Sequence, residues 1–62
     1  MAIELQAAKV RAAEINALEA RDWLIYDLAK AERKELMADE MFNKFDFVAI
    51  CKAEGIDWRS CF

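Results

Sequence analysis

The 62-residue sequence contains no histidine and no proline, and it has one glycine and two cysteines. Without histidine, one chain cannot assemble a Ser-His-Asp or Cys-His nucleophile, and the commonest zinc ligand is missing. Cys51 and Cys61 match no zinc motif, and the surroundings of Gly55 lack the alternating oxygen ligands of a calcium loop. The sequence therefore predicts no enzyme activity, no metal, no other cofactor and no small-molecule substrate.

Long apolar runs and an excess of basic charge are also lacking. No run approaches the roughly 20 apolar residues of a transmembrane helix, and the N-terminus lacks the basic and apolar regions of a secretory signal. The formal net charge is -3, with acids and bases interleaved, which disfavours broad binding to nucleic-acid phosphates or to anionic membranes. A single pair of cysteines without a signal favours reduced thiols. We therefore expect a cytoplasmic protein that binds no membrane.

Good helix formers dominate the composition and predict an all-α chain with a single small domain over residues 1–62. Residues 2–39 contain neither glycine nor proline, and their apolar positions recur at spacings of three and four. We predict one long amphipathic helix there. The alternative is two helices, with Arg21 ending the first and Asp22 capping the second. Charge pairs such as Arg11 and Glu14 fit the support of exposed helix faces.

A bend is predicted over residues 39–43, because Asn43 is followed three residues later by an acid, as in a capping box. The second helix should run from Lys44 to Glu54. Gly55 then stands where a left-handed residue commonly ends a helix. A short helical tail should follow over residues 58–62.

These elements predict a hairpin-like arrangement in which the short helix covers only the C-terminal part of the long one. The short helix would be about 16 Å long, so the alanine-rich N-terminal half would have no partner within the chain. The apolar run over residues 23–28 would lie at the junction of the two helices and a second chain. Because so short a chain is marginally stable alone, the sequence predicts a homo-oligomer or a complex with a larger protein.

The seven aromatic residues also favour association with another chain. They exceed what two helices can enclose, and aromatic residues are enriched in protein interfaces. The protein is therefore interpreted as an interaction module that docks by helix packing, either an assembly or scaffold subunit or a small inhibitor or adaptor. Small helical chains of this kind are frequent among phage accessory proteins. The predicted interface residues are Val10, Trp23, Tyr26, Phe42, Phe45, Trp58 and Phe62.

Residues 48–62 allow a different interpretation. An apolar helix ends there in a glycine and an apolar residue, and an arginine, a small residue and a phenylalanine come next; the positions are Gly55, Ile56, Arg59, Ser60 and Phe62. This pattern resembles the first part of the helix-turn-helix of TetR-like regulators. Glu54 departs from the pattern, because an apolar residue is usual there, and the second helix would be truncated. The resemblance implies a DNA-binding module as the alternative function, with Lys52 and Arg59 as contact candidates.

Overall fold

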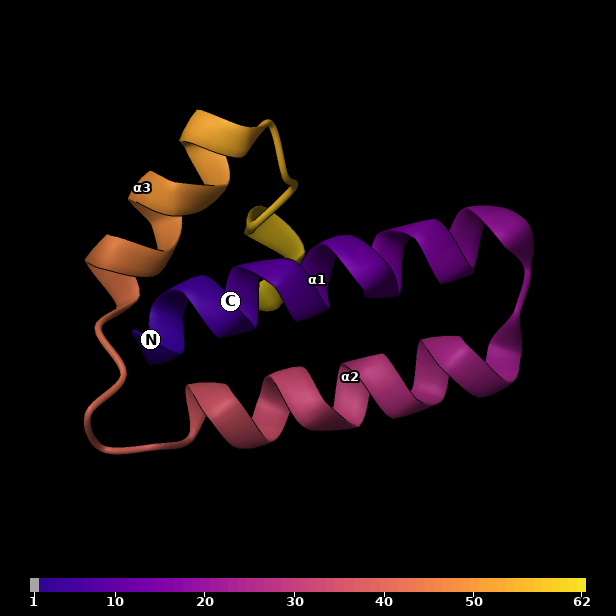
Figure 1. The fold of residues 1–62 in the computed structure, drawn as a ribbon, viewed down its shortest axis with the longest axis horizontal. Coiled ribbons are helices and arrows are strands. Elements are labelled where there is room, and N and C mark those ends of the chain that lie inside the picture. Colours follow the sequence, from indigo (N-terminus) through magenta and orange to yellow (C-terminus); the bar gives the residue numbers. More distant parts are fainter. Residues whose placement is uncertain (1) are drawn as a thin grey trace.

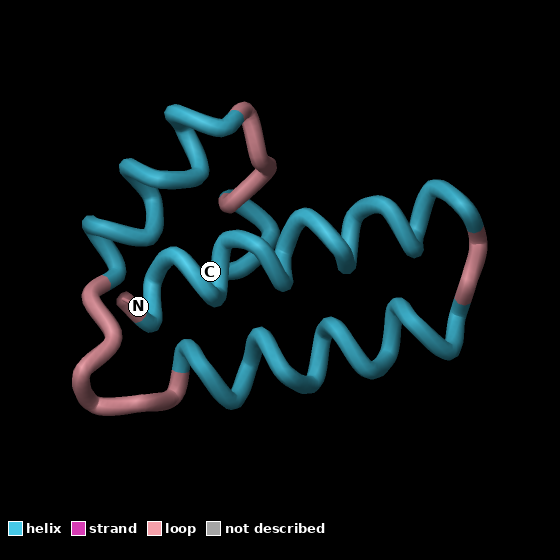
Figure 2. The backbone as a smooth tube through the Cα atoms, viewed as in Figure 1, coloured by secondary structure: helices cyan, strands magenta, loops and turns pink. Residues whose placement is uncertain are grey.

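Three helices and a 3-10 turn make up the computed structural model, which describes residues 2–62. Helices α1 (Ile3–Ala20) and α2 (Trp23–Met37) form an antiparallel hairpin, and α3 (Lys44–Glu54) crosses the N-terminal half of α1 (Figure 1). The 3-10 turn η1 (Arg59–Cys61) returns to the flank of α1 (Figure 2). The molecule measures 30 × 22 × 21 Å. The predicted all-α class is confirmed, and the described residues contain no strand.

The single helix predicted over residues 2–39 is wrong, because the chain reverses between α1 and α2. Arg21 adopts the left-handed conformation, with φ of 56° and ψ of 33°. Its N–H donates to the Leu18 carbonyl at 3.1 Å, and the N–H of Asp22 donates to the Ala17 carbonyl at 2.9 Å. These bonds form a Schellman-type ending without glycine. The Asp22 carboxylate then caps α2, so the structure adopts the two-helix alternative.

Glycine at position 21 should stabilise the protein, because a non-glycine residue in the left-handed conformation is strained. We expect Arg21→Gly to raise the free energy of unfolding by about 0.5–1 kcal/mol, and hence the Tm by a few degrees. Urea and thermal unfolding followed by circular dichroism measure this. Arg21→Ala removes the same side chain and keeps the strain, so it should not stabilise. Equal effects of the two substitutions would show that the side chain, not the backbone, matters.

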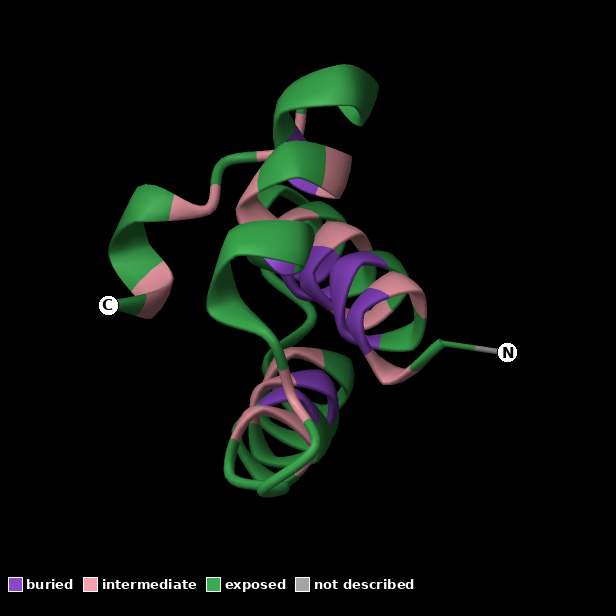
Figure 3. Ribbon diagram, turned by 90° about the vertical axis from the view of Figure 1, so that its left-hand side faces the viewer, coloured by how far each residue is buried: buried purple, intermediate pink, exposed green. Residues whose placement is uncertain are grey.

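The chain's own helices cover the alanine-rich half of α1, so the expectation that this half lacks a partner within the chain is wrong. The first helix lies between α2 and α3, and its buried residues face both (Figure 3). Ala7 and Ala8 are buried in one cluster with Phe47 and Cys51 of α3. Because alanine side chains are small, the helix axes approach closely and the phenylalanine ring fills the space between them.

The bend and the third helix agree with the sequence prediction. Asn43 Oδ1 accepts two N–H groups of the first turn of α3, at 2.9 and 3.1 Å, while its own N–H donates to Glu4 Oε2 at 2.9 Å. At the other end, Gly55 has φ of 69°, and the Ile56 N–H donates to the Cys51 carbonyl at 2.8 Å. The predicted bounds of this helix, both of its caps and the short helical tail are confirmed.

Candidate functional site

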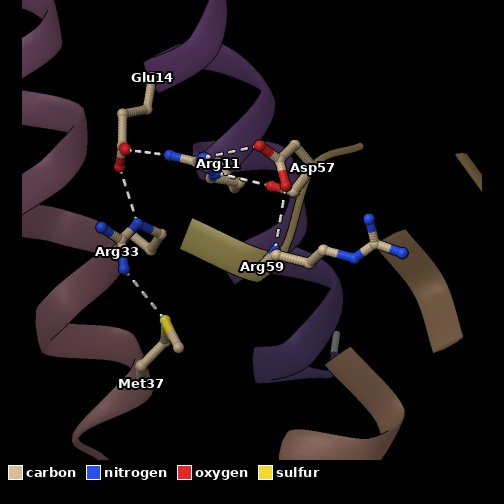
Figure 4. Close-up of polar contacts among 6 residues, drawn as sticks. All are labelled: Arg11, Glu14, Arg33, Met37, Asp57 and Arg59. Atoms are coloured by element: carbon tan, nitrogen blue, oxygen red, sulfur yellow. Dashed lines mark hydrogen bonds and ion pairs between the residues drawn. The ribbon is translucent and has the colours of Figure 1, made fainter. Parts of the chain in front are cut away.

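A buried ionic network joins α1, α2 and the C-terminal segment (Figure 4). Glu14 of α1 is 2% exposed. Its Oε2 accepts from Arg11 Nη1, and its Oε1 accepts from Arg33 Nε at 2.7 Å. Arg11 Nε also donates to the Asp57 carbonyl at 2.8 Å. The pair Arg11 and Glu14 was predicted to support an exposed face, and that interpretation is wrong because both side chains are buried.

The network holds the fold together and offers no catalytic group. Guanidinium groups do not lose a proton in proteins. Both oxygens of the Glu14 carboxylate are taken by arginine donors, and the group is closed off from solvent. It cannot meet a substrate in this arrangement. Its role is to fix α2 and the C-terminal segment on α1.

An open cavity of about 500 Å³ lies beside this network, between the C-terminal half of α2 and the 3-10 turn. Three basic side chains line it together with one hydroxyl, one thiol and two apolar residues: Lys30, Arg33, Lys34, Met37, Ala38, Ser60 and Cys61. The cavity therefore combines positive charge with a small apolar wall.

Both cysteines have free thiols, and neither is activated. Burial raises the pKa of the Cys51 thiol, and the nearby Cys61 raises it further, while Arg11 lowers it. Burial also raises the pKa of the Cys61 thiol, against the lowering effect of Arg33 and Arg11. Since the thiolate is the nucleophile, both groups are in the unreactive, protonated form at neutral pH.

Large apolar side chains gather at the closed end of the α1–α2 hairpin. Leu24 is 72% exposed and Leu28, one turn further along α2, is 61% exposed. Both lie on the side of α2 turned away from the buried Ala29 and Arg33. We call the set the hairpin-end surface, and its members are Leu18, Trp23, Leu24, Ile25 and Leu28.

A second apolar area covers the bend before α3 and the outer side of that helix. Met41 and Phe45 are both 80% exposed. Beside them lies a hollow of about 370 Å³, lined by Lys44, Phe45, Val48, Ala49, Lys52 and Trp58. This area has fewer large apolar side chains than the hairpin-end surface, and lysines border it.

The structure does not bring the seven predicted interface residues onto one surface. Trp23 is 55% exposed at the hairpin end, with the Tyr26 ring edge-on to it at 6.0 Å between centroids. Phe45 lies on the outer side of α3. Val10, on α1, is half-buried. That these residues contact another chain stays a prediction.

Of the three remaining predicted interface residues, Phe42 and Trp58 pack against the core, and Phe62 is 54% exposed. The Phe42 ring lies 5.5 Å from the Phe47 ring, and the Phe62 ring lies edge-on to Phe47 at 5.9 Å. Trp58 is half-buried against the same cluster. Lys52 Nζ and Arg59 Cζ each lie 5.6 Å from the Trp58 ring centroid, so the two DNA-contact candidates are neighbours. The segment that follows Gly55 forms a three-residue 3-10 turn instead of a longer helix.

Leu24 and Leu28 belong to the apolar run over residues 23–28, which was predicted to lie at a junction of the two helices and a second chain. The reversal at Arg21 separates this run from the apolar positions of α1, and both leucines face outward. The two leucines were not among the predicted interface residues. The signal for them is the run of four consecutive large apolar residues from Trp23 to Tyr26, which cannot all face one neighbour.

Comparisons with protein-family models, with curated proteins and with solved structures found no match to this chain. Within residues 2–62, no three acidic, cysteine or histidine side chains gather where they could hold a metal ion. None of the described helices is long and apolar enough to cross a membrane.

Proposed function

We propose that this protein is a non-catalytic interaction module that binds a protein partner, either a second copy or a larger protein, through the hairpin-end surface. One observation carries the proposal. Leu24 and Leu28 stand largely exposed, one turn apart, while the chain buries Glu14 and Arg33 inside. Burying one such leucine contributes roughly 1.5–3 kcal/mol, and contiguous exposed apolar residues mark interaction sites in soluble proteins.

The spacing of the exposed residues favours docking by helix packing. Leu24, Leu28 and Ala31 follow one another at the four- and three-residue steps that bring side chains onto one face of a helix. Asp27 and Glu32 border this face with charge. A helix of this form lays its apolar side into a groove on its partner. In that role the protein would act as a scaffold subunit, an inhibitor or an adaptor, and its cytoplasmic location stays a prediction.

The test replaces the two leucines by lysine. Because both side chains are exposed, we expect Leu24→Lys with Leu28→Lys to keep the circular dichroism spectrum and to weaken association at least about 30-fold, since two buried leucines are lost from the contact. Sedimentation equilibrium measures association of the protein with itself. If the protein is monomeric, quantitative affinity capture from lysate compares the bound proteins between variants.

The matched control is Met41→Lys with Phe45→Lys, which changes two equally exposed residues, one in the bend before α3 and one on α3. This pair should leave association within about twofold of the unchanged protein. The proposal fails if the protein is monomeric and captures the same proteins with and without Leu24 and Leu28. It also fails if the two double variants lose association equally.

DNA binding remains the second candidate, and the neighbouring positions of Lys52 and Arg59 around Trp58 favour it. Cationic side chains beside a half-buried aromatic ring suit a nucleic-acid backbone and its bases. A DNA mobility-shift assay over a range of salt concentrations decides the question. No shift at low salt ends this candidate.

A further inference from the structure

The cavity between α2 and the 3-10 turn is separate from the hairpin-end surface, and it has the composition of an anion site. Its basic lining residues come from α2, and Ser60 comes from the C-terminal turn, which lies far away in the sequence. Among the described residues that line the cavity, none is acidic. In a chain with a formal net charge of -3, this is a local concentration of positive charge.

Arg33 is the central group, because it is buried yet incompletely bonded. It is 5% exposed, and its Nε donates to Glu14 Oε1. Its Nη1 donates to the Met37 sulfur at 3.3 Å, and a thioether sulfur is a weak acceptor. Its Nη2 has no acceptor within residues 2–62, whereas every fully buried side-chain nitrogen of that range has a partner. Nη2 is therefore not fully buried, and Arg33 is one of the residues that line the cavity.

The positive charge of the cavity comes from its lysines. Arg11 and Arg33 share the carboxylate of Glu14, and Arg11 also lies 3.8 Å from the Asp57 carboxylate, so two acids balance the two arginines. Lys30 and Lys34 also line the cavity, and within residues 2–62 neither forms an ion pair. A dianion placed in the cavity would therefore meet two ammonium groups and the Arg33 guanidinium group, whose Nη2 has no acceptor in that range.

We propose that this cavity binds the phosphate group of a small phosphate monoester. The Nη1 and Nη2 donors of Arg33 present the fork that binds two phosphate oxygens at once. Lys30 and Lys34 supply point charges, and the Ser60 hydroxyl supplies a further donor. The cavity is larger than a phosphate group, and Met37 and Ala38 give part of its wall an apolar character that suits the organic portion of the ligand.

The test titrates the ¹⁵N-labelled protein with inorganic phosphate and with phenyl phosphate at constant ionic strength. We expect both to shift the NMR signals of the Ser60 and Cys61 amides and of Arg33 Nε, with phenyl phosphate binding more tightly. Sodium chloride at the same ionic strength should shift them little. Equal shifts with chloride would show general screening of charge and would overturn the proposal.

Variants locate the binding groups. Lys30→Gln with Lys34→Gln should weaken phosphate binding about tenfold or more, because two charged donors are lost. The matched control is Lys9→Gln with Lys44→Gln, which makes the same change of charge on α1 and α3 and should alter binding less than twofold. Both pairs lie on the surface, so unfolding does not obscure the result. Equal losses from the two pairs would contradict a defined site.

Discussion

Phe47→Ala should leave the protein largely unfolded at 25 °C. The Phe47 side chain is 0% exposed, and it fills the space between α3 and the alanine face of α1. Removing a buried phenylalanine ring costs about 3–5 kcal/mol, and a core in a domain of this size rarely supplies more than about 3–5 kcal/mol in total. The Phe42 and Phe62 rings also lose their common neighbour. Urea unfolding followed by far-ultraviolet circular dichroism measures the loss.

Phe45→Ala is the matched control, since it removes the same ring from the same helix two residues away. Phe45 is 80% exposed, so we expect a change within about 0.5 kcal/mol. The comparison tests which face of α3 packs against the core. Equal losses from the two substitutions would mean that α3 does not present Phe47 to the core as described.

The third helix could be predicted from the sequence because both of its end signals are local. Asn43 caps its own first turn, and Gly55 supplies the left-handed residue at the end. Each signal acts over a few neighbouring residues and does not depend on the rest of the fold. The bounds of α3 therefore follow from the sequence with no knowledge of the packing.

The reversal between α1 and α2 could not be predicted in the same way. Arg21 takes a conformation that glycine usually takes, so the composition of the turn gives no signal. The strain is offset by the packing of α2 along α1, which brings together residues distant in the sequence. Because the break gives no local signal, the sequence does not show that Leu24 and Leu28 lie near the closed end of a hairpin.

The two polar features depend on the same long-range packing. A pair at the spacing of Arg11 and Glu14 looks the same whether it is exposed or buried. Its burial follows from the approach of Arg33, 19 residues beyond Glu14, on the antiparallel partner helix. The basic cavity likewise exists because the C-terminal turn brings Ser60 next to Lys34 and its neighbours. No local pattern in the sequence contains either arrangement.

Glu14→Leu should destabilise the protein by about 3–5 kcal/mol, because the guanidinium groups of Arg11 and Arg33 would remain buried without their shared anion. Arg33 would keep the Met37 sulfur as its described acceptor, and Arg11 would keep the carbonyl and the distant carboxylate of Asp57. Glu14→Gln retains an acceptor oxygen, so its free energy of unfolding should lie between that of the unchanged protein and that of Glu14→Leu. Urea unfolding of the three proteins at one pH and salt concentration gives the order.

The combined variant Arg11→Met, Glu14→Leu and Arg33→Met separates two contributions to the free energy of unfolding. One is the net contribution of the intact network, and the other is the penalty for removing a single partner from it. Replacing a buried ion group entirely by apolar side chains is often neutral or stabilising by about 1–4 kcal/mol, whereas removing one partner is not. We therefore expect the triple variant to recover most of the loss caused by Glu14→Leu alone. A triple variant less stable than Glu14→Leu would show that the ionic contacts themselves, including the bond from Arg11 Nε to the Asp57 carbonyl, hold the C-terminal segment on α1.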